Sequence, residues 1–160
     1  MIRKSTRTGA SSMTLEQIRK KYANDRFATD AAGVRIVSAE PGHAVCAMPV
    51  TPIHRNALGN PQGGAIFTLA DFTFAVASNA FSEYVSVSMQ HDITFLRTSK
   101  GTELTAEAFS IRDGRHTCFY RVDVTDDCGA LIAVMTVNGF VTAQKNGDVS
   151  PDSTDSTVNA

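Results

Sequence analysis

The sequence contains few cysteines, carries almost no net charge and lacks a long apolar run. Its three cysteines, Cys46, Cys118 and Cys128, are odd in number and lack metal-ligand spacing, which argues against a disulfide framework and favours a reducing compartment. The formal net charge of −1 offers no overall field for nucleic acid or an anionic membrane surface. No apolar run could span a bilayer, and no apolar stretch follows the basic N-terminus as in a secretory signal. We therefore expect a soluble, cytoplasmic protein with a small-molecule partner.

The chain length fits one domain. Its 160 residues are enough to bury a core without help from disulfides or a metal ion. Residues 1–12 and 144–160 are rich in Ser, Thr, Asp, Asn and Gly and have few apolar side chains. Such segments bury too little apolar surface to offset the entropy of ordering, so we predict two disordered tails around a single domain at residues 13–143.

One acidic residue stands inside the most apolar predicted helix. Residues 64–79 are apolar nearly all round the helix, and Asp71 is the only ionisable residue between Arg55 and Glu83. Burying an unpaired carboxylate is costly, so such a group finds a partner or has its pKa raised. Gly63 and Gly64 precede the helix and leave its first backbone N–H groups open to a ligand. Together these features predict a carboxylate that works with an oxyanion site.

Most of the remaining sequence reads as antiparallel strands. Turn signals at Pro41-Gly42 and Asp113-Gly114 separate two pairs of strands. Apolar and polar residues alternate along the segment 85–96, with Ser88 on the polar side, and the alternation is broken only by His91 on the apolar side. A capping box at Thr14 predicts a short helix to about residue 24, which would pack as a lid or a brace. A sheet with one apolar face can cover the apolar helix, which gives an α+β fold. The predicted strands are 34–39, 44–50, 85–96, 104–111, 116–124 and 131–141.

The polar loop residue, the glycine pair and the helix acid form one motif at fixed spacing, supported by a strand motif and by Gly114. The two motifs are Asn56-x6-Gly63-Gly64-Ala65-Ile66-Phe67-x-Leu69-Ala70-Asp71 and Ile93-x-Phe95-Leu96-Arg97. Over about residues 14–142 the sequence resembles the hotdog-fold acyl-CoA thioesterases of the PaaI type. The resemblance implies a curved antiparallel sheet wrapped around a long central helix. It also implies hydrolysis of acyl-CoA thioesters to free acid and CoA, with CoA as part of the substrate, no separate cofactor and no metal.

The same resemblance implies roles for individual residues. It assigns the donation of a backbone N–H to the thioester carbonyl to Gly63, hydrolysis to Asp71 and substrate positioning to Asn56. Many relatives carry His where Gln62 stands here, and Gln cannot shuttle a proton at neutral pH. The residues do not decide whether the acid attacks directly or acts as a general base on water.

The spacing of the glycine and the acid predicts a dimer. Gly63 and Asp71 are eight residues apart, or roughly 12 Å along a helix axis. An oxyanion donor and an attacking group must each lie within about 3 Å of the same carbonyl group. We therefore expect two antiparallel copies of the helix to pair Gly63 of one chain with Asp71 of the other, so that a monomer is inactive. A further pairing of dimers is also expected.

Several alternatives stay open. Ser88 could hold the acid or the water, Gly64 could contact substrate, and Arg97 and Arg115 could meet CoA phosphates or simply be solvated charges. Asp71 could instead be a buried acid paired with Arg97 or Arg121. A hydratase or dehydratase of the same fold usually requires a His with the acid, and no His lies in the motif. A non-catalytic acyl-CoA binding module is the third possibility.

Overall fold

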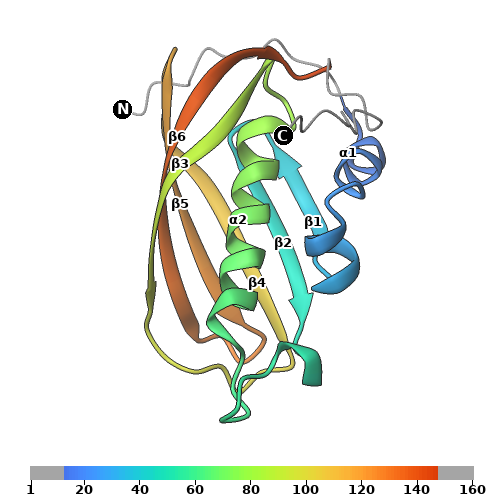
Figure 1. Cartoon of the computed structure of the whole chain (residues 1–160), viewed down its shortest axis with the longest axis vertical. Coiled ribbons are helices and arrows are strands. Elements are labelled where there is room, and N and C mark those ends of the chain that lie inside the picture. Colours follow the sequence, from blue (N-terminus) through green and yellow to red (C-terminus); the bar gives the residue numbers. More distant parts are fainter. Residues whose placement is uncertain (1–12, 148–160) are drawn as a thin grey trace, which may run out of the picture.

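A 17-residue helix, α2 (Gly63–Asn79), lies across one face of a six-stranded antiparallel sheet in the computed structural model, which describes residues 13–147 (Figure 1). The strands are ordered β1-β2-β4-β5-β6-β3, so that β1 and β3 form the two edges. The predicted hotdog architecture is therefore confirmed. The strands are β1 (Arg35–Glu40), β2 (His43–Pro49), β3 (Tyr84–Phe95), β4 (Glu103–Asp113), β5 (Thr117–Asp126) and β6 (Leu131–Lys145).

The core lies between α2 and the sheet. Leu69 and Val76 of α2 are fully buried against a layer that includes Val122 and Met135. Phe74 of α2 meets a buried tyrosine of β5 edge-on, at 5.3 Å between ring centroids. The apolar surfaces of the helix and of the sheet are removed from water only when they pack against each other, so this burial is the main force that holds the two layers together.

One stripe of α2 stays open. Gly64 is exposed, and Phe67, Thr68, Asp71 and Ala75 are only partly buried. Their spacing of three or four residues places them on one side of the helix. The acid therefore lies in the middle of the one face of α2 that the sheet does not cover.

The helix α1 (Leu15–Tyr22) acts as a brace, as predicted. The capping box forms, with the Thr14 hydroxyl accepting the N–H of Gln17. Ile18 is buried, and the Tyr22 hydroxyl donates to the carbonyl of Ala75 in α2 at 2.9 Å. A short helical segment, η1 (Phe27–Ala31), follows and was not predicted.

The C-terminal boundary of the domain differs from the prediction. Strand β6 runs to Lys145, which pairs with Tyr84 of β3, so residues 144 and 145 belong to the sheet rather than to a tail. Residues 146 and 147 follow as a turn, and the remaining parts of the two predicted tails, residues 1–12 and 148–160, lie outside the described residues. Within residues 13–147, no helix combines the length and the hydropathy that crossing a bilayer requires.

Candidate functional site

The start of α2 leaves two backbone donors open. Gln62 is the N-cap, and its side-chain oxygen accepts the N–H of Ala65 at 3.0 Å. The structure gives the N–H groups of Gly63 and Gly64 no acceptor within residues 13–147. These donors also lie at the positive end of the helix dipole, which favours a developing negative charge. The position is therefore suited to hold an oxyanion.

Gln62, a candidate catalytic residue from its place before the glycine pair, caps the helix in the structure through its amide oxygen. Its backbone N–H donates to the carbonyl of His54 at 2.7 Å, which ties the preceding loop to the helix start. Gln62 thus orders the backbone beside the open donors of Gly63 and Gly64, and this structural use needs no proton transfer. A catalytic role for Gln62 stays a prediction.

Gly63 has a close neighbour. A Cβ added at Gly63 would lie 3.2 Å from Cζ of Phe95 on β3, which is closer than most Cβ atoms lie to a neighbouring atom. A side chain there would have to push the ring aside. The absence of a side chain therefore keeps the first turn of α2 beside Phe95, which is half exposed.

Asn56 closes its own loop. Its side-chain oxygen accepts the N–H groups of Leu58 and Asn60 at 2.9 and 3.1 Å. The loop follows the short helical turn η2 (Pro52–His54) and leads into α2. The structure thus gives Asn56 a role in closing its loop, and its predicted role toward a substrate stays a prediction.

Asp71 lies on the open stripe of α2, with 45% of its side chain exposed. Burial raises the pKa of its carboxyl, His91 opposes this rise, and the carboxylate of Asp25 adds to it. A carboxyl whose pKa is raised is a better proton acceptor than an ordinary one, so the shift suits either of the roles considered for the acid.

The predicted arginine partners of Asp71 are wrong. Arg121 pairs with Asp123 at 2.8 Å, and Arg97 is exposed beyond the end of β3. The partner is His91 of β3, whose Nε2 lies 3.3 Å from Oδ1 of Asp71. The only sequence signal for this pairing was a histidine on the apolar side of a strand.

A β-bulge in β3 changes which of its side chains share a face, and the regular alternation predicted from the sequence did not include it. The register shifts between Ser88 and Gln90, so that Ser88 lies across from Gly139 of β6 and His91 lies across from Val137. Positions 137 and 139 of β6 share a face, so Ser88 and His91 also share one face. Ser88 was assigned to the polar side of the alternation and His91 to the apolar side, whereas the bulge places both on one face of β3. That Ser88 holds the acid or the water stays a prediction.

The two predicted basic contacts lie far apart in one chain. Arg97 follows the end of β3 that pairs with Ala133, whereas Arg115 lies in the turn between β4 and β5, near the other end of β6. Both are exposed. That either arginine meets the phosphates of CoA stays a prediction.

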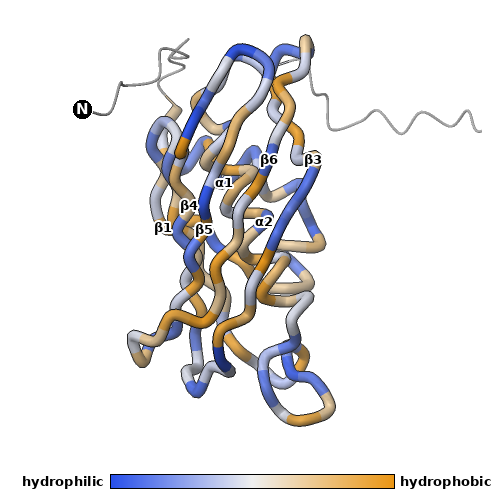
Figure 2. Tube along the Cα trace, turned by 90° about the vertical axis from the view of Figure 1, so that its left-hand side faces the viewer, coloured by the Kyte–Doolittle hydropathy of each residue, from blue (hydrophilic) through white to orange (hydrophobic). Residues whose placement is uncertain are grey.

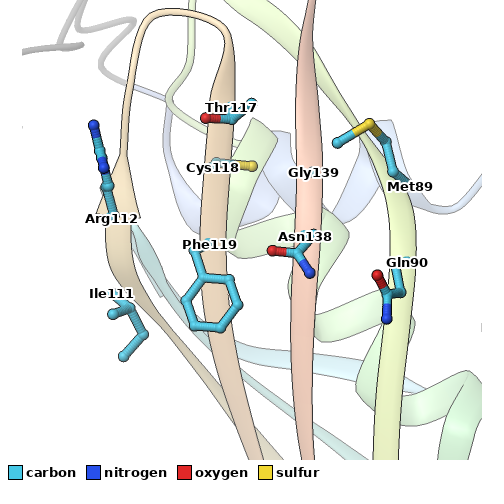
Figure 3. A pocket seen from close by; sticks show the side chains of 9 residues that line it. All are labelled: Met89, Gln90, Ile111, Arg112, Thr117, Cys118, Phe119, Asn138 and Gly139. Atoms are coloured by element: carbon cyan, nitrogen blue, oxygen red, sulfur yellow. The ribbon is translucent and has the colours of Figure 1, made fainter.

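An open pocket of about 630 Å³ lies over strands β3 to β6 (Figure 3). It contains neither the acid nor the glycine pair. Figure 2, seen from the side of β3 and β6, shows hydrophobic and hydrophilic residues mixed along both strands. The pocket is lined by Met89, Gln90, Ile111, Arg112, Thr117, Cys118, Phe119, Asn138 and Gly139.

Among the described residues, no three His, Cys, Asp or Glu side chains gather as a metal site requires.

Comparison with known sequences identifies relatives over the same region. The thioesterase superfamily matches residues 59–133. The acyl-coenzyme A thioesterase PaaI of Escherichia coli is 34% identical over 114 residues, which are 71% of this chain and 80% of PaaI. Human acyl-coenzyme A thioesterase 13 is 33% identical over 103 residues, which are 62% of this chain and 74% of the relative.

Comparison with solved structures agrees. The structure of PaaI from the phenylacetic acid degradation operon of E. coli matches with a TM-score of 0.72 and 26% identity, covering 82% of this chain and 99% of PaaI. A thioesterase protein of Streptococcus pneumoniae, solved with coenzyme A, matches with a TM-score of 0.70 and 28% identity, covering 77% of this chain and 98% of that chain. The chain therefore belongs to the hotdog-fold thioesterase superfamily, and within it to the PaaI type.

Proposed function

We propose that the protein hydrolyses acyl-CoA thioesters to a free acid and CoA. The observation that carries the proposal is the occurrence, on one helix, of a Gly63 amide that has no acceptor within residues 13–147 and of a partly exposed Asp71 carboxylate whose pKa is raised. The names of E. coli PaaI and human thioesterase 13, and the coenzyme A in the S. pneumoniae structure, support acyl-CoA as the substrate.

The chemistry follows from these two groups. The N–H of Gly63 stabilises the negative oxygen that forms when the thioester carbonyl is attacked. Asp71 either takes a proton from the attacking water or attacks the carbon itself and forms an anhydride that water then opens. In both routes the carbon–sulfur bond breaks, the thiolate of CoA leaves and is protonated, and the acid is released.

The two groups can act on one substrate only if they come from two chains that are related by a two-fold axis. They lie roughly 12 Å apart along α2 of a single chain. The open stripe of α2 around Asp71, and the edge of β3 that pairs with no other strand of the described chain, offer a surface on which a second copy can pack. Met89 and Phe95 on β3 are exposed apolar side chains that such packing would cover. We propose a homodimer with antiparallel α2 helices and two equivalent sites, which can pair further into a tetramer.

A second candidate is hydration of an enoyl-CoA. A histidine and acid pair suits that chemistry, and the structure places His91 beside Asp71. However, only 10% of the His91 side chain is exposed, and its ring packs against Phe67 and Phe74. A substrate therefore reaches the acid more directly than the imidazole, which favours hydrolysis.

Thiol release from a panel of acyl-CoAs tests the proposal. We expect release from at least one aromatic, branched or straight-chain acyl-CoA, and none from the Asp71→Asn variant of the same dimer. Loss of the double bond of an enoyl-CoA without thiol release would instead support the hydratase. Binding of every acyl-CoA without turnover would support a non-catalytic module, and an Asp71→Asn variant with full activity would overturn the assignment of the acid.

A further inference from the structure

His91 occupies an unusual position for a histidine. Its side chain is nine-tenths buried, and its ring centroid lies 5.0 Å from that of Phe67 and 6.0 Å from that of Phe74. Its Nε2 atom is buried and makes no hydrogen bond within residues 13–147. A buried polar atom left without a hydrogen bond costs stability, so its presence beside an acid calls for a reason.

Within residues 13–147, the charged atom that Nε2 approaches belongs to the acid. Nε2 lies 3.3 Å from Oδ1 of Asp71, an ion-pair distance if the ring is protonated. The two groups are close enough for a hydrogen bond but are not aligned as one. The contact joins β3 to α2, two elements that the core already holds in place.

We propose that His91 is a positioning residue for the acid, which it keeps ionised and directed toward the open side of α2. This inference rests on the proposed function, because the hydrolysis needs an ionised carboxylate at Asp71. His91 is not itself a catalytic residue, because the rings of Phe67 and Phe74 and its deep burial keep a substrate away from it.

The electrostatics of the site agree with this role. Burial raises the pKa of Asp71 and so favours its neutral form, and Asp25 adds to the rise from the turn after α1. His91 is the group that lowers the pKa. Without His91, burial and Asp25 would act unopposed, so the acid would stay protonated up to a higher pH.

The alternative is that His91 only fills space between two phenylalanine rings. A phenylalanine fills a similar space without a donor, and a glutamine keeps an N–H donor without a positive charge. The variants His91→Phe and His91→Gln therefore separate packing from charge. If packing alone matters, His91→Phe leaves the pH profile unchanged and His91→Gln lowers the melting temperature without moving the profile.

The pH dependence of kcat/KM tests the proposal. We expect the acidic limb to move upward by about one pH unit in both variants, the low end of the effect of an adjacent opposite charge on a carboxyl. At a pH on that limb, kcat falls about tenfold while KM is nearly unchanged. An acidic limb at the wild-type pH in a folded His91→Phe dimer would overturn the role.

A second measurement does not depend on turnover. Carbon-13 NMR of labelled aspartate follows the carboxyl of Asp71, whose signal is identified by its loss in Asp71→Asn. We expect its titration midpoint to rise in His91→Phe and in His91→Gln, and an unchanged midpoint in both would reject the inference. If the wild-type protein releases no thiol from any acyl-CoA, the proposed function fails, whereas this titration still decides the role of His91.

Discussion

The side-chain oxygen of Gln62 accepts the backbone N–H of Ala65 at 3.0 Å. This bond satisfies the third amide of α2 and leaves the first two, those of Gly63 and Gly64, as donors without a partner in the described chain. Gln62 thus caps the helix and leaves at its start two amides that, in the proposed function, receive the oxyanion.

The Gly63→Pro variant tests this donor. Gly63 is the first residue of α2, where proline is well tolerated, and Gln62 before it already has an extended backbone, with ψ of 136°. Proline removes the N–H and no helical hydrogen bond. We expect kcat to fall by about 10²- to 10³-fold, the usual cost of losing one oxyanion donor, as measured by thiol release.

The matched control for this prediction is Gly63→Ala. Alanine brings the same Cβ toward Phe95 as proline does but keeps the N–H. Its activity should fall much less than that of Gly63→Pro. Equal losses in the two variants would mean that the contact with Phe95, rather than the donor, causes the effect.

Asp71→Asn should make the protein more stable while it removes activity. A carboxyl whose pKa is raised on folding holds its proton more tightly in the native state, so stability falls as the pH rises from its ordinary value of about 4 through the raised value. Asparagine carries no charge and escapes this loss. We expect a higher melting temperature than wild type at pH 7, measured by calorimetry.

The pH dependence of that gain is its control. As the pH falls below the pKa of Asp71, both proteins carry a neutral side chain at this position, so the difference in melting temperature should shrink toward zero. A gain of equal size at low and neutral pH would show that it does not come from the charge.

The three cysteines should differ in reactivity. Cys46 and Cys118 are buried and Cys128 is exposed, and burial raises the pKa of the Cys46 thiol to about 12. Because the thiolate is the reactive form, we expect the folded protein to react at Cys128 alone. Mass spectrometry after brief alkylation would check this, with Cys128→Ser as the control. Rapid labelling of Cys46 in the native protein would contradict its burial.

The main features of the fold could be predicted from the sequence because they depend on local periodicity. The apolar helix around Asp71 and the predicted strands are all found, with ends that differ by a few residues. The segment η1 was missed because five residues are too few to show a helical period. The end of β6 was missed because its last residues are polar and are ordered by pairing with β3.

The site was predicted less completely. The glycine pair and the acid could be singled out as candidates because their spacing lies within one helix. The bulge after Ser88 could not be predicted, because nothing in the alternation of the strand marks the inserted residue. That bulge places His91 against α2, twenty positions beyond Asp71, and such a contact depends on the packing of helix on sheet rather than on local sequence.

Complementation between two inactive variants tests the shared site most directly. Gly63→Pro and Asp71→Asn are each expected to be nearly inactive alone. In a mixed dimer, the intact Gly63 of the Asp71→Asn chain meets the intact Asp71 of the Gly63→Pro chain, which restores one of the two sites. If chains exchange at random after refolding together, the mixture should recover about a quarter of the wild-type activity. Activity no greater than the sum of the two variants, in a mixture shown to contain mixed dimers, would contradict a site built from two chains.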